Sequence, residues 1–250
     1  MSGHSKWANI QHRKGRQDAR RGKLFARLSR QIIVAAREGG GDPGMNAKLR
    51  TMVEEAKLAE MAKDRIDYAI KRGTGEIEGA SYESARYEGY GPAGVAMIID
   101  VLTDNQQRSV SDVRFIMRRH GGSLGSPGCV TWMFEPKGVI VVPQEALDEE
   151  AAYELAIEAG AEEVLDDEAG GWEIRTAPGD LQVVVEAIRQ AGYHPERVEL
   201  TMVPATTTAV PDEDAPKLLR LLEELNDHDD VDQVYANFEI SDEVLEKLAG

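Results

Sequence analysis

The order of strand-like and helical runs in residues 137–204 is the strongest constraint on the fold. Short β-rich runs and longer helical runs follow one another as strand, helix, strand, strand, helix, strand. The predicted elements are Val139–Val142, Asp148–Ala159, Glu163–Asp166, Trp172–Thr176, Asp180–Gln190 and Arg197–Val203. This order is that of the ferredoxin-like unit, an α/β sandwich. The segment therefore predicts a complete α+β domain.

The flanking residues contain two further strand–helix–strand groups. The first is a strand at Gly94–Leu102, a helix with a capping-type start at Ser109 and Asp112, and a strand at Val130–Phe134. The second is Thr206–Val210, Asp214–Leu225 and Val231–Ile240, in the same order. Joined together, the two groups predict a second ferredoxin-like unit, split at its central hairpin by the first. Insertion at a hairpin is tolerated because the chain ends there lie close together. Three consecutive domains are the plain alternative.

The N-terminal part predicts three helices. The first begins at Asp18, carries an apolar stripe with cations on the opposite side, and ends at the glycine run 39–41. Asp42-Pro43 predicts the cap and first turn of the second helix, and the third stops at Gly73. The whole chain is thus predicted to be an α+β multidomain protein, with a three-helix domain and two ferredoxin-like domains, one inserted in the other. The predicted boundaries are 1–78, 79–136 with 205–250, and 137–204.

Charge divides the chain unevenly. Residues 1–75 hold 17 Lys and Arg against 8 Asp and Glu, a net charge of +9, whereas the remainder holds 12 basic and 37 acidic residues, a net charge of −25. Residues 138–174 alone contain 12 acidic residues and no basic one. Such asymmetry indicates a module that faces nucleic acid, carried on an acidic body that phosphates avoid. The plainer interpretation is that these charges only solvate helix surfaces.

The candidate nucleic-acid-binding residues gather near the N-terminus, where nine cations in residues 6–30 face a single Asp18. If half of them touched phosphates, the logarithm of affinity would fall with that of salt at a slope of about −4. Trp7 could stack on an unpaired base or pack on the helices. The candidates are Lys6, Trp7, His12, Arg13, Lys14, Arg16, Arg20, Arg21, Lys23, Arg27 and Arg30. A secondary basic patch is predicted at Arg108, Arg114, Arg118 and Arg119.

Enzymatic chemistry is not indicated. None of the five histidines stands in a zinc-binding spacing, so no metal and no cofactor are predicted. The glycine-rich run Gly121–Gly128 follows a helix and precedes a strand, which favours a tight connection over a phosphate loop. Cys129, the only cysteine, is expected to be a buried small hydrophobe. Without a secretory signal or an apolar stretch long enough to span a bilayer, the chain is expected to be cytoplasmic.

Several motifs resemble those of the YebC/PmpR family over nearly the whole chain. They are Gly3–Trp7, Arg37–Pro43 with Asn46, Lys71–Gly75, Tyr87–Pro92, Thr103–Asn105 with Arg108, Val113–Arg114, Gly121–Gly125, and Asp229–Tyr235 with Asn237. The resemblance implies the same three-domain architecture with one domain inserted in another. One departure is Met61-Ala62-Lys63-Asp64, where the family often has Met-Pro-Lys-Asp. Loss of that proline would let the second and third helices run on.

The resemblance also implies a function. Members of the family are commonly described as cytoplasmic, DNA-binding transcriptional regulators, related mitochondrial proteins activate translation, and bacterial members resemble ribosome-associated factors that relieve stalling at proline-rich sequences. The expected partner is therefore DNA, ribosomal RNA or the ribosome, with no membrane and no small-molecule substrate. Because the sequence carries no base-reading motif, its cations favour contacts to the nucleic-acid backbone. An enzyme and an adaptor that docks basic proteins on the acidic domain remain the alternatives.

Overall fold

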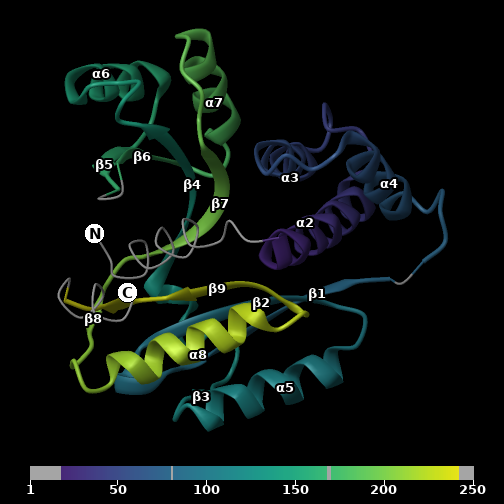
Figure 1. Ribbon diagram of the computed structural model, residues 1–250, viewed down its shortest axis with the longest axis vertical. Coiled ribbons are helices and arrows are strands. Elements are labelled where there is room, and N and C mark those ends of the chain that lie inside the picture. Colours follow the sequence, from purple (N-terminus) through teal and green to yellow (C-terminus); the bar gives the residue numbers. More distant parts are fainter. Residues whose placement is uncertain (1–17, 80, 168–169, 242–250) are drawn as a thin grey trace. The chain divides into compact units, whose positions relative to one another are not determined.

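The computed structural model describes residues 18–79, 81–167 and 170–241 (Figure 1). The chain divides into two compact units. The first contains the chain up to Lys23, Gly79–Glu135 and the chain from Pro204 onward, and the second contains Leu24–Glu78 and Pro136–Val203. The residues 136–203 thus interrupt the first unit in sequence. The division into three domains stays a prediction.

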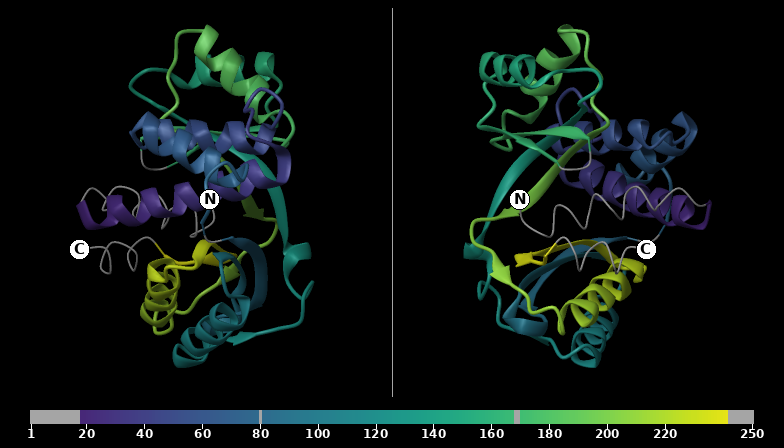
Figure 2. Two further views of the ribbon diagram at one scale, coloured as in Figure 1. Left: turned by 90° about the vertical axis from the view of Figure 1, so that its right-hand side faces the viewer. Right: turned by 60° about the vertical axis from the view of Figure 1, so that its left-hand side comes forward.

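The sheet of the first unit has the strand order β3-β1-β2-β9. Its elements are β1 (Glu83–Tyr90), β2 (Ala96–Thr103), α5 (Gln106–Arg119), β3 (Ser123–Leu124), α8 (Ala215–Asp227) and β9 (Val231–Ala236). All three strand pairings are antiparallel. Met97, Ile99 and Val101 of β2 share a buried cluster with residues of α5 and α8, and Figure 2 shows both helices on one face of this sheet.

This sheet has the ferredoxin-like strand order, but one of its strands comes from a different part of the chain than the sequence predicts. The strand between β2 and β3 is β1, which precedes both in the chain and was not predicted. The predicted strand Val130–Phe134 is instead a 3-10 turn, η2 (Thr131–Met133), that leads into β4. The predicted strand Thr206–Val210 shrinks to β8 (Thr208–Ala209), which pairs only with β10 (Phe238–Glu239).

The predicted C-terminal strand Val231–Ile240 is also divided, because β9 ends before Asn237 and β10 begins after it. The predicted helix start at Ser109 is wrong as well. Helix α5 begins at Gln106, and the Asn105 side chain caps it by accepting the Arg108 N–H. Ser109 is buried inside the helix, where its hydroxyl donates within the unit instead of capping.

The inserted residues form the predicted ferredoxin-like domain. Its sheet has the order β5-β6-β4-β7, and the helices α6 and α7 share a buried core with its strands. The elements are β4 (Phe134–Pro143), α6 (Glu149–Ala159), β5 (Glu163–Asp166), β6 (Gly171–Thr176), α7 (Leu181–Gln190) and β7 (Arg197–Pro204). The Asp148 carboxylate caps α6, and Gly160 ends it in the left-handed conformation. The pattern was sufficient here because every predicted element contributes apolar residues to one buried core.

Three helices precede the first sheet in the chain: α2 (Asp18–Gly39), α3 (Ala47–Leu58) and α4 (Lys63–Gly73). From Leu24 onward they belong to the second unit. Asn46 joins the first two, since its amide donates to Ala35 O and Gly40 O while its oxygen accepts the Leu49 N–H. The predicted cap at Asp42 is therefore wrong. That carboxylate accepts the Gly44 N–H within the preceding turn.

The absence of proline at position 62 does not fuse the second and third helices. Helix α3 ends at Leu58 and α4 begins at Lys63, with Glu60 between them at φ 60°. Gly73 ends α4 against α2, where a Cβ would lie 2.5 Å from the Ile33 carbonyl oxygen. Side chains from α3 also bond α7, through Thr51 with Gln182 and Glu54 with Arg189.

Candidate nucleic-acid interface

Most of the predicted N-terminal site cannot be placed. Six of its residues lie outside the described part of the chain, namely Lys6, Trp7, His12, Arg13, Lys14 and Arg16. Arg20 and Arg21 belong to α2, but their side chains also fall outside the described part. The prediction for these eight residues stays a prediction.

The described cations of α2 do not form the open face that the sequence predicts. Residues 31–36 are all buried, so this part of the helix is enclosed on every side instead of presenting one apolar stripe. Arg27 is 23% exposed, with its guanidinium 3.8 Å from the Glu55 carboxylate, and Arg30 is half-buried. Lys23 is exposed, and its Nζ lies 3.2 Å from Asp227 Oδ1. The carboxylate partners come from distant elements, which helical periodicity does not reveal.

Helix α5 carries the clearest exposed cations among the described residues. Arg114 and Arg118 stand one turn apart and are exposed, and neither forms an ion pair with any described residue. Phe115 lies between them and is 65% exposed. Two guanidinium groups beside an exposed aromatic ring can contact phosphates and stack on a base. Sequence analysis found the arginines but missed Phe115, although its position opposite the buried Val113 and Ile116 signals an outward ring.

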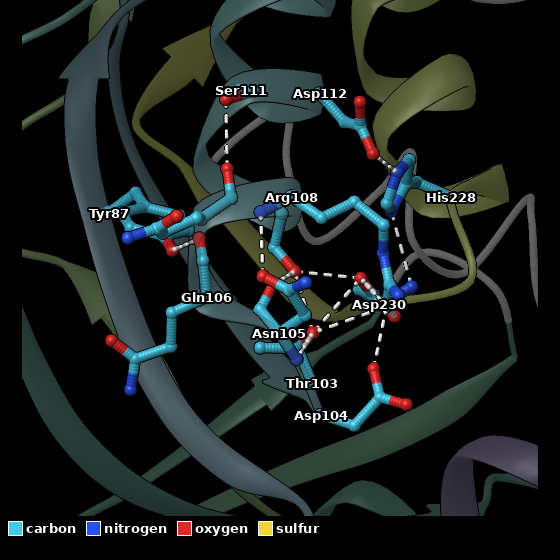
Figure 3. A network of polar contacts seen from close by, with 12 residues as sticks. Tyr87, Thr103, Asp104, Asn105, Gln106, Arg108, Ser111, Asp112, His228 and Asp230 are labelled. Carbon is cyan, nitrogen blue, oxygen red and sulfur yellow. Dashed lines mark hydrogen bonds and ion pairs between the residues drawn. The ribbon is translucent and has the colours of Figure 1, made fainter.

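The other two arginines of the predicted secondary patch are paired with carboxylates. Arg108 Nη2 lies 2.8 Å from Asp230 Oδ2 and 2.9 Å from Asp104 Oδ1 (Figure 3). The hydroxyls of Ser109 and Thr103 also donate to Asp230 Oδ2, at 2.7 and 3.1 Å. Burial opposes ionisation, but these donors lower the pKa of Asp230 below its ordinary value. Arg108 therefore holds β9 to the start of α5 and is not a free phosphate contact.

Arg119 forms a second paired site with Glu224 of α8. Its Nη1 lies 3.0 Å from Glu224 Oε1, and His120 Nε2 lies 2.6 Å from Glu224 Oε2. The hydrogen bond with His120 is the main reason that the pKa of Glu224 is lowered. Because Arg119 remains 61% exposed, this pair joins two helices at the surface and contributes little to stability.

Helix α4 presents exposed charges of both signs that the sequence analysis did not single out, because Asp64 and Asp67 are exposed beside Arg65 and Lys71. Arg65, Tyr68 and Lys71 are exposed at three-residue intervals, which places them along one side of the helix. The Arg65 guanidinium lies 5.4 Å from the centre of the Phe25 ring, within the range of a cation–π contact. The spacing of these three residues is visible in the sequence, but only the apolar positions of the helix were used to predict it.

The glycine-rich loop after α5 is organised by one buried carboxylate. Glu88 of β1 is 7% exposed and accepts the N–H groups of Gly128, Val130 and Thr131 at 2.7–2.9 Å. Burial raises the pKa of Glu88, but the three backbone donors outweigh it and the pKa is lowered. The loop is thus tied to the sheet, in keeping with a connection and not a phosphate-binding loop.

Metal and thiol chemistry find little support in the described part of the chain. No group of three or more His, Cys, Asp or Glu side chains there is placed to hold a metal ion. Cys129 is half-buried, and burial raises the pKa of its thiol, which disfavours the reactive thiolate. No helix among the described residues is long and apolar enough to cross a membrane.

Comparison with protein families then identifies the chain. The model of the TACO1/YebC protein N-terminal domain matches residues 5–76, and that of the TACO1/YebC second and third domain matches residues 82–238. The chain belongs to the TACO1/YebC family. The resemblance found in the motifs is confirmed, and the second model covers both the split and the inserted parts of the chain.

Relatives of this TACO1/YebC protein share its whole length. Proteins named probable transcriptional regulatory protein are 53% identical in Persephonella marina and 49% identical in Magnetococcus marinus, each covering 100% of both chains. The crystal structure of a conserved hypothetical protein from Aquifex aeolicus is 46% identical, with a TM-score of 0.84, and covers 91% of this chain and 94% of that one. The α+β architecture is therefore that of a solved family member.

Proposed function

We propose that this TACO1/YebC protein is a regulatory protein that binds DNA or structured RNA, acts in the cytoplasm and catalyses no reaction. The observation that carries the proposal is the pair Arg114 and Arg118, exposed beside Phe115 on α5 without a carboxylate partner among the described residues. Relatives named probable transcriptional regulatory proteins, similar over the full length, support a role in gene expression. The basic N-terminal residues remain part of the proposed binding set on the strength of their charge in the sequence.

The cations of α2 differ in how readily they could exchange their present contacts for a phosphate. The Lys23–Asp227 pair is exposed on both sides, and such pairs contribute at most about 1 kcal/mol. A phosphate can therefore replace Asp227. Arg27 and Arg30 are half-buried, and their replacement by glutamate would leave buried carboxylates and threaten the fold.

The test is a double variant, Arg114→Glu with Arg118→Glu, measured for binding to promoter duplex and to structured RNA over a range of salt concentrations. Both side chains are exposed, so the variant should fold with an unchanged circular dichroism spectrum. Loss of two phosphate contacts should weaken binding and make the salt slope shallower by about 2.

The matched control is Arg114→Lys with Arg118→Lys, which keeps the charges and should keep most of the affinity. Unchanged affinity in the glutamate variant would remove α5 from the interface. No binding of the wild-type chain to either nucleic acid would end the proposal. Equal affinity for promoter and scrambled duplexes would argue against a sequence-selective regulator.

A ribosome-associated translation factor that relieves stalling, for example at proline-rich sequences, is the second candidate function. The exposed Phe115 beside two arginines favours it, since such rings stack on unpaired bases, which structured RNA offers and duplex DNA does not. Co-sedimentation with the large ribosomal subunit at low salt is the expected result. Absence from ribosome fractions under those conditions would exclude this candidate.

A further inference from the structure

The turn η2 exposes a tryptophan next to a second aromatic ring. Trp132 is 71% exposed and Tyr90, at the end of β1, is 37% exposed. Both rings donate to one acceptor, the Cys129 carbonyl oxygen, with Trp132 Nε1 at 3.1 Å and Tyr90 Oη at 3.3 Å. The shared acceptor places the polar edges of the two rings side by side. The flat faces of the two rings carry no hydrogen-bonding group, so another ring can stack on them without leaving a donor or acceptor unsatisfied.

The segment under these rings is firmly held. Glu88 accepts three N–H groups from residues 128–131, and its own carbonyl oxygen accepts the Gly125 N–H at 2.8 Å. Val130 is fully buried beneath the turn. Because the support is fixed, the indole does not need to be ordered at the moment of binding, which lowers the entropic cost of using it as a contact.

The surroundings suit an anionic ligand. Residues 121–134 contain no charged side chain, and the first carboxylate after them is the exposed Glu135 of β4. The buried charge of Glu88 is met by three donors. The exposed Lys217 of α8 supplies a cation close to Gly121, because its Nζ lies 2.5 Å from the position that a Cβ on Gly121 would take. The next residue, Gly122, lies against the backbone of Tyr90, since a Cβ on Gly122 would be 2.8 Å from the Tyr90 carbonyl oxygen.

The size of the aromatic surface decides the class of ligand. A stable protein interface covers about 800 Å² on each partner around an apolar core. Here the two rings stand among Gly, Ser and Thr, and no other large hydrophobic side chain of residues 121–135 is exposed to the same degree. Two adjacent flat rings match one or two stacked bases, with a phosphate within reach of a lysine.

We propose that Trp132 and Tyr90 form a stacking site for unpaired nucleobases of single-stranded RNA, with Lys217 as the phosphate contact. This inference rests on the proposed nucleic-acid-binding function and specifies its ligand as unpaired nucleotides. It is separate from the arginine face of α5, because it uses the loop that follows that helix. Base stacking tolerates any sequence, which accords with a protein that carries no base-reading motif.

The experiment compares the full-length wild type with Trp132→Phe and Trp132→Ala, using a fluorescently labelled oligoadenylate of about 12 nucleotides and a duplex RNA of equal length. Trp132→Ala should weaken single-strand binding by about 5- to 150-fold and duplex binding far less. Trp132→Phe should keep most of the affinity. In unlabelled titrations, oligoadenylate should quench wild-type tryptophan emission and shield it from acrylamide. The share of both effects that comes from Trp132 should be lost in Trp132→Phe, which leaves only the contributions of Trp7 and Trp172.

The control is Tyr153→Ala, which removes from the acidic helix α6 a ring that is 43% exposed, close to the 37% of Tyr90, and should leave both affinities unchanged. Wild-type binding of oligoadenylate that persists in Trp132→Ala, or that falls equally for duplex, would overturn the stacking site while leaving the proposed function intact. Failure of the wild type to bind any nucleic acid would overturn both.

Discussion

At the scale of single residues, the arginines of α5 have different roles because of their neighbours. Arg108 is held by Asp104 and Asp230, whereas Arg114, less than two turns further along the helix, has no described carboxylate beside it. Two carboxylates beside a guanidinium offset its positive charge, so a phosphate is attracted to it less than to an arginine with no carboxylate beside it. The number of cations in a patch therefore overstates its capacity to bind nucleic acid.

Glu88 leads to a prediction about acid sensitivity. Its pKa is lowered from the ordinary 4.5, so its ionised form stabilises the fold above that pH, and this contribution is lost as pH falls through the lower pKa of the folded state. Glu88→Gln should lower the free energy of unfolding at pH 7 by about 1–3 kcal/mol, because an amide N–H₂ then faces backbone donors.

Urea unfolding of wild type and Glu88→Gln between pH 7 and pH 3 measures this effect. The wild type should lose stability more steeply than the variant below about pH 4.5. Glu83→Gln, an exposed carboxylate of the same strand, is the control and should follow the wild type. Parallel pH profiles for all three proteins would contradict the assignment of acid sensitivity to Glu88.

At the scale of elements, the break between α3 and α4 depends on backbone geometry and not on proline. Ala62 already has φ −60°, the value that proline imposes, and its N–H forms no hydrogen bond with a described residue. The left-handed Glu60, followed by the Met61 N–H that donates to Ala56 O at 2.9 Å, ends α3 without it. Proline at this position would only restrict the unfolded chain.

We therefore expect Ala62→Pro to stabilise the protein by about 0.4–1 kcal/mol. Ala59→Pro is the matched contrast: the Ala59 N–H donates to Glu55 O at 2.9 Å, and its loss should destabilise by about 3 kcal/mol. Thermal unfolding followed by circular dichroism separates the two. A lower melting temperature for Ala62→Pro would show that the junction has another backbone geometry in solution.

At the scale of the whole molecule, the sheet of the first unit must be assembled from strands that lie on either side of residues 136–203 in the chain. Asn237 contributes to this closure. Its Oδ1 accepts the Ala96 N–H at 2.8 Å, its Nδ2 donates to Thr206 O at 3.1 Å, and its side chain is buried. One amide thus connects β2 with both the entry to β8 and the break between β9 and β10.

Asn237→Ala should lower the free energy of unfolding by about 2–3 kcal/mol, because the buried Ala96 N–H and Thr206 carbonyl lose their partner. Hydrogen exchange resolved by segment should show faster exchange in β2 and β8, with protection in α6 and α7 unchanged. Asn226→Ala, which removes an exposed side chain from α8, should change stability by no more than about 0.5 kcal/mol. Uniform loss of protection in both units would contradict a role confined to the first.

The sequence by itself determined the α+β class, the inserted ferredoxin-like domain and the three N-terminal helices, because the spacing of apolar residues along each element records helix or strand whatever its neighbours are. Only the tertiary structure decided that β1 fills the split sheet, since Glu83–Tyr90 is largely polar and is held by pairing with β2 and β3. It also decided which described cations are free, because Arg27 and Arg108 meet carboxylates at Glu55 and Asp230 that are remote in sequence. Local patterns encode burial, whereas charge pairing and strand neighbours depend on contacts between distant residues.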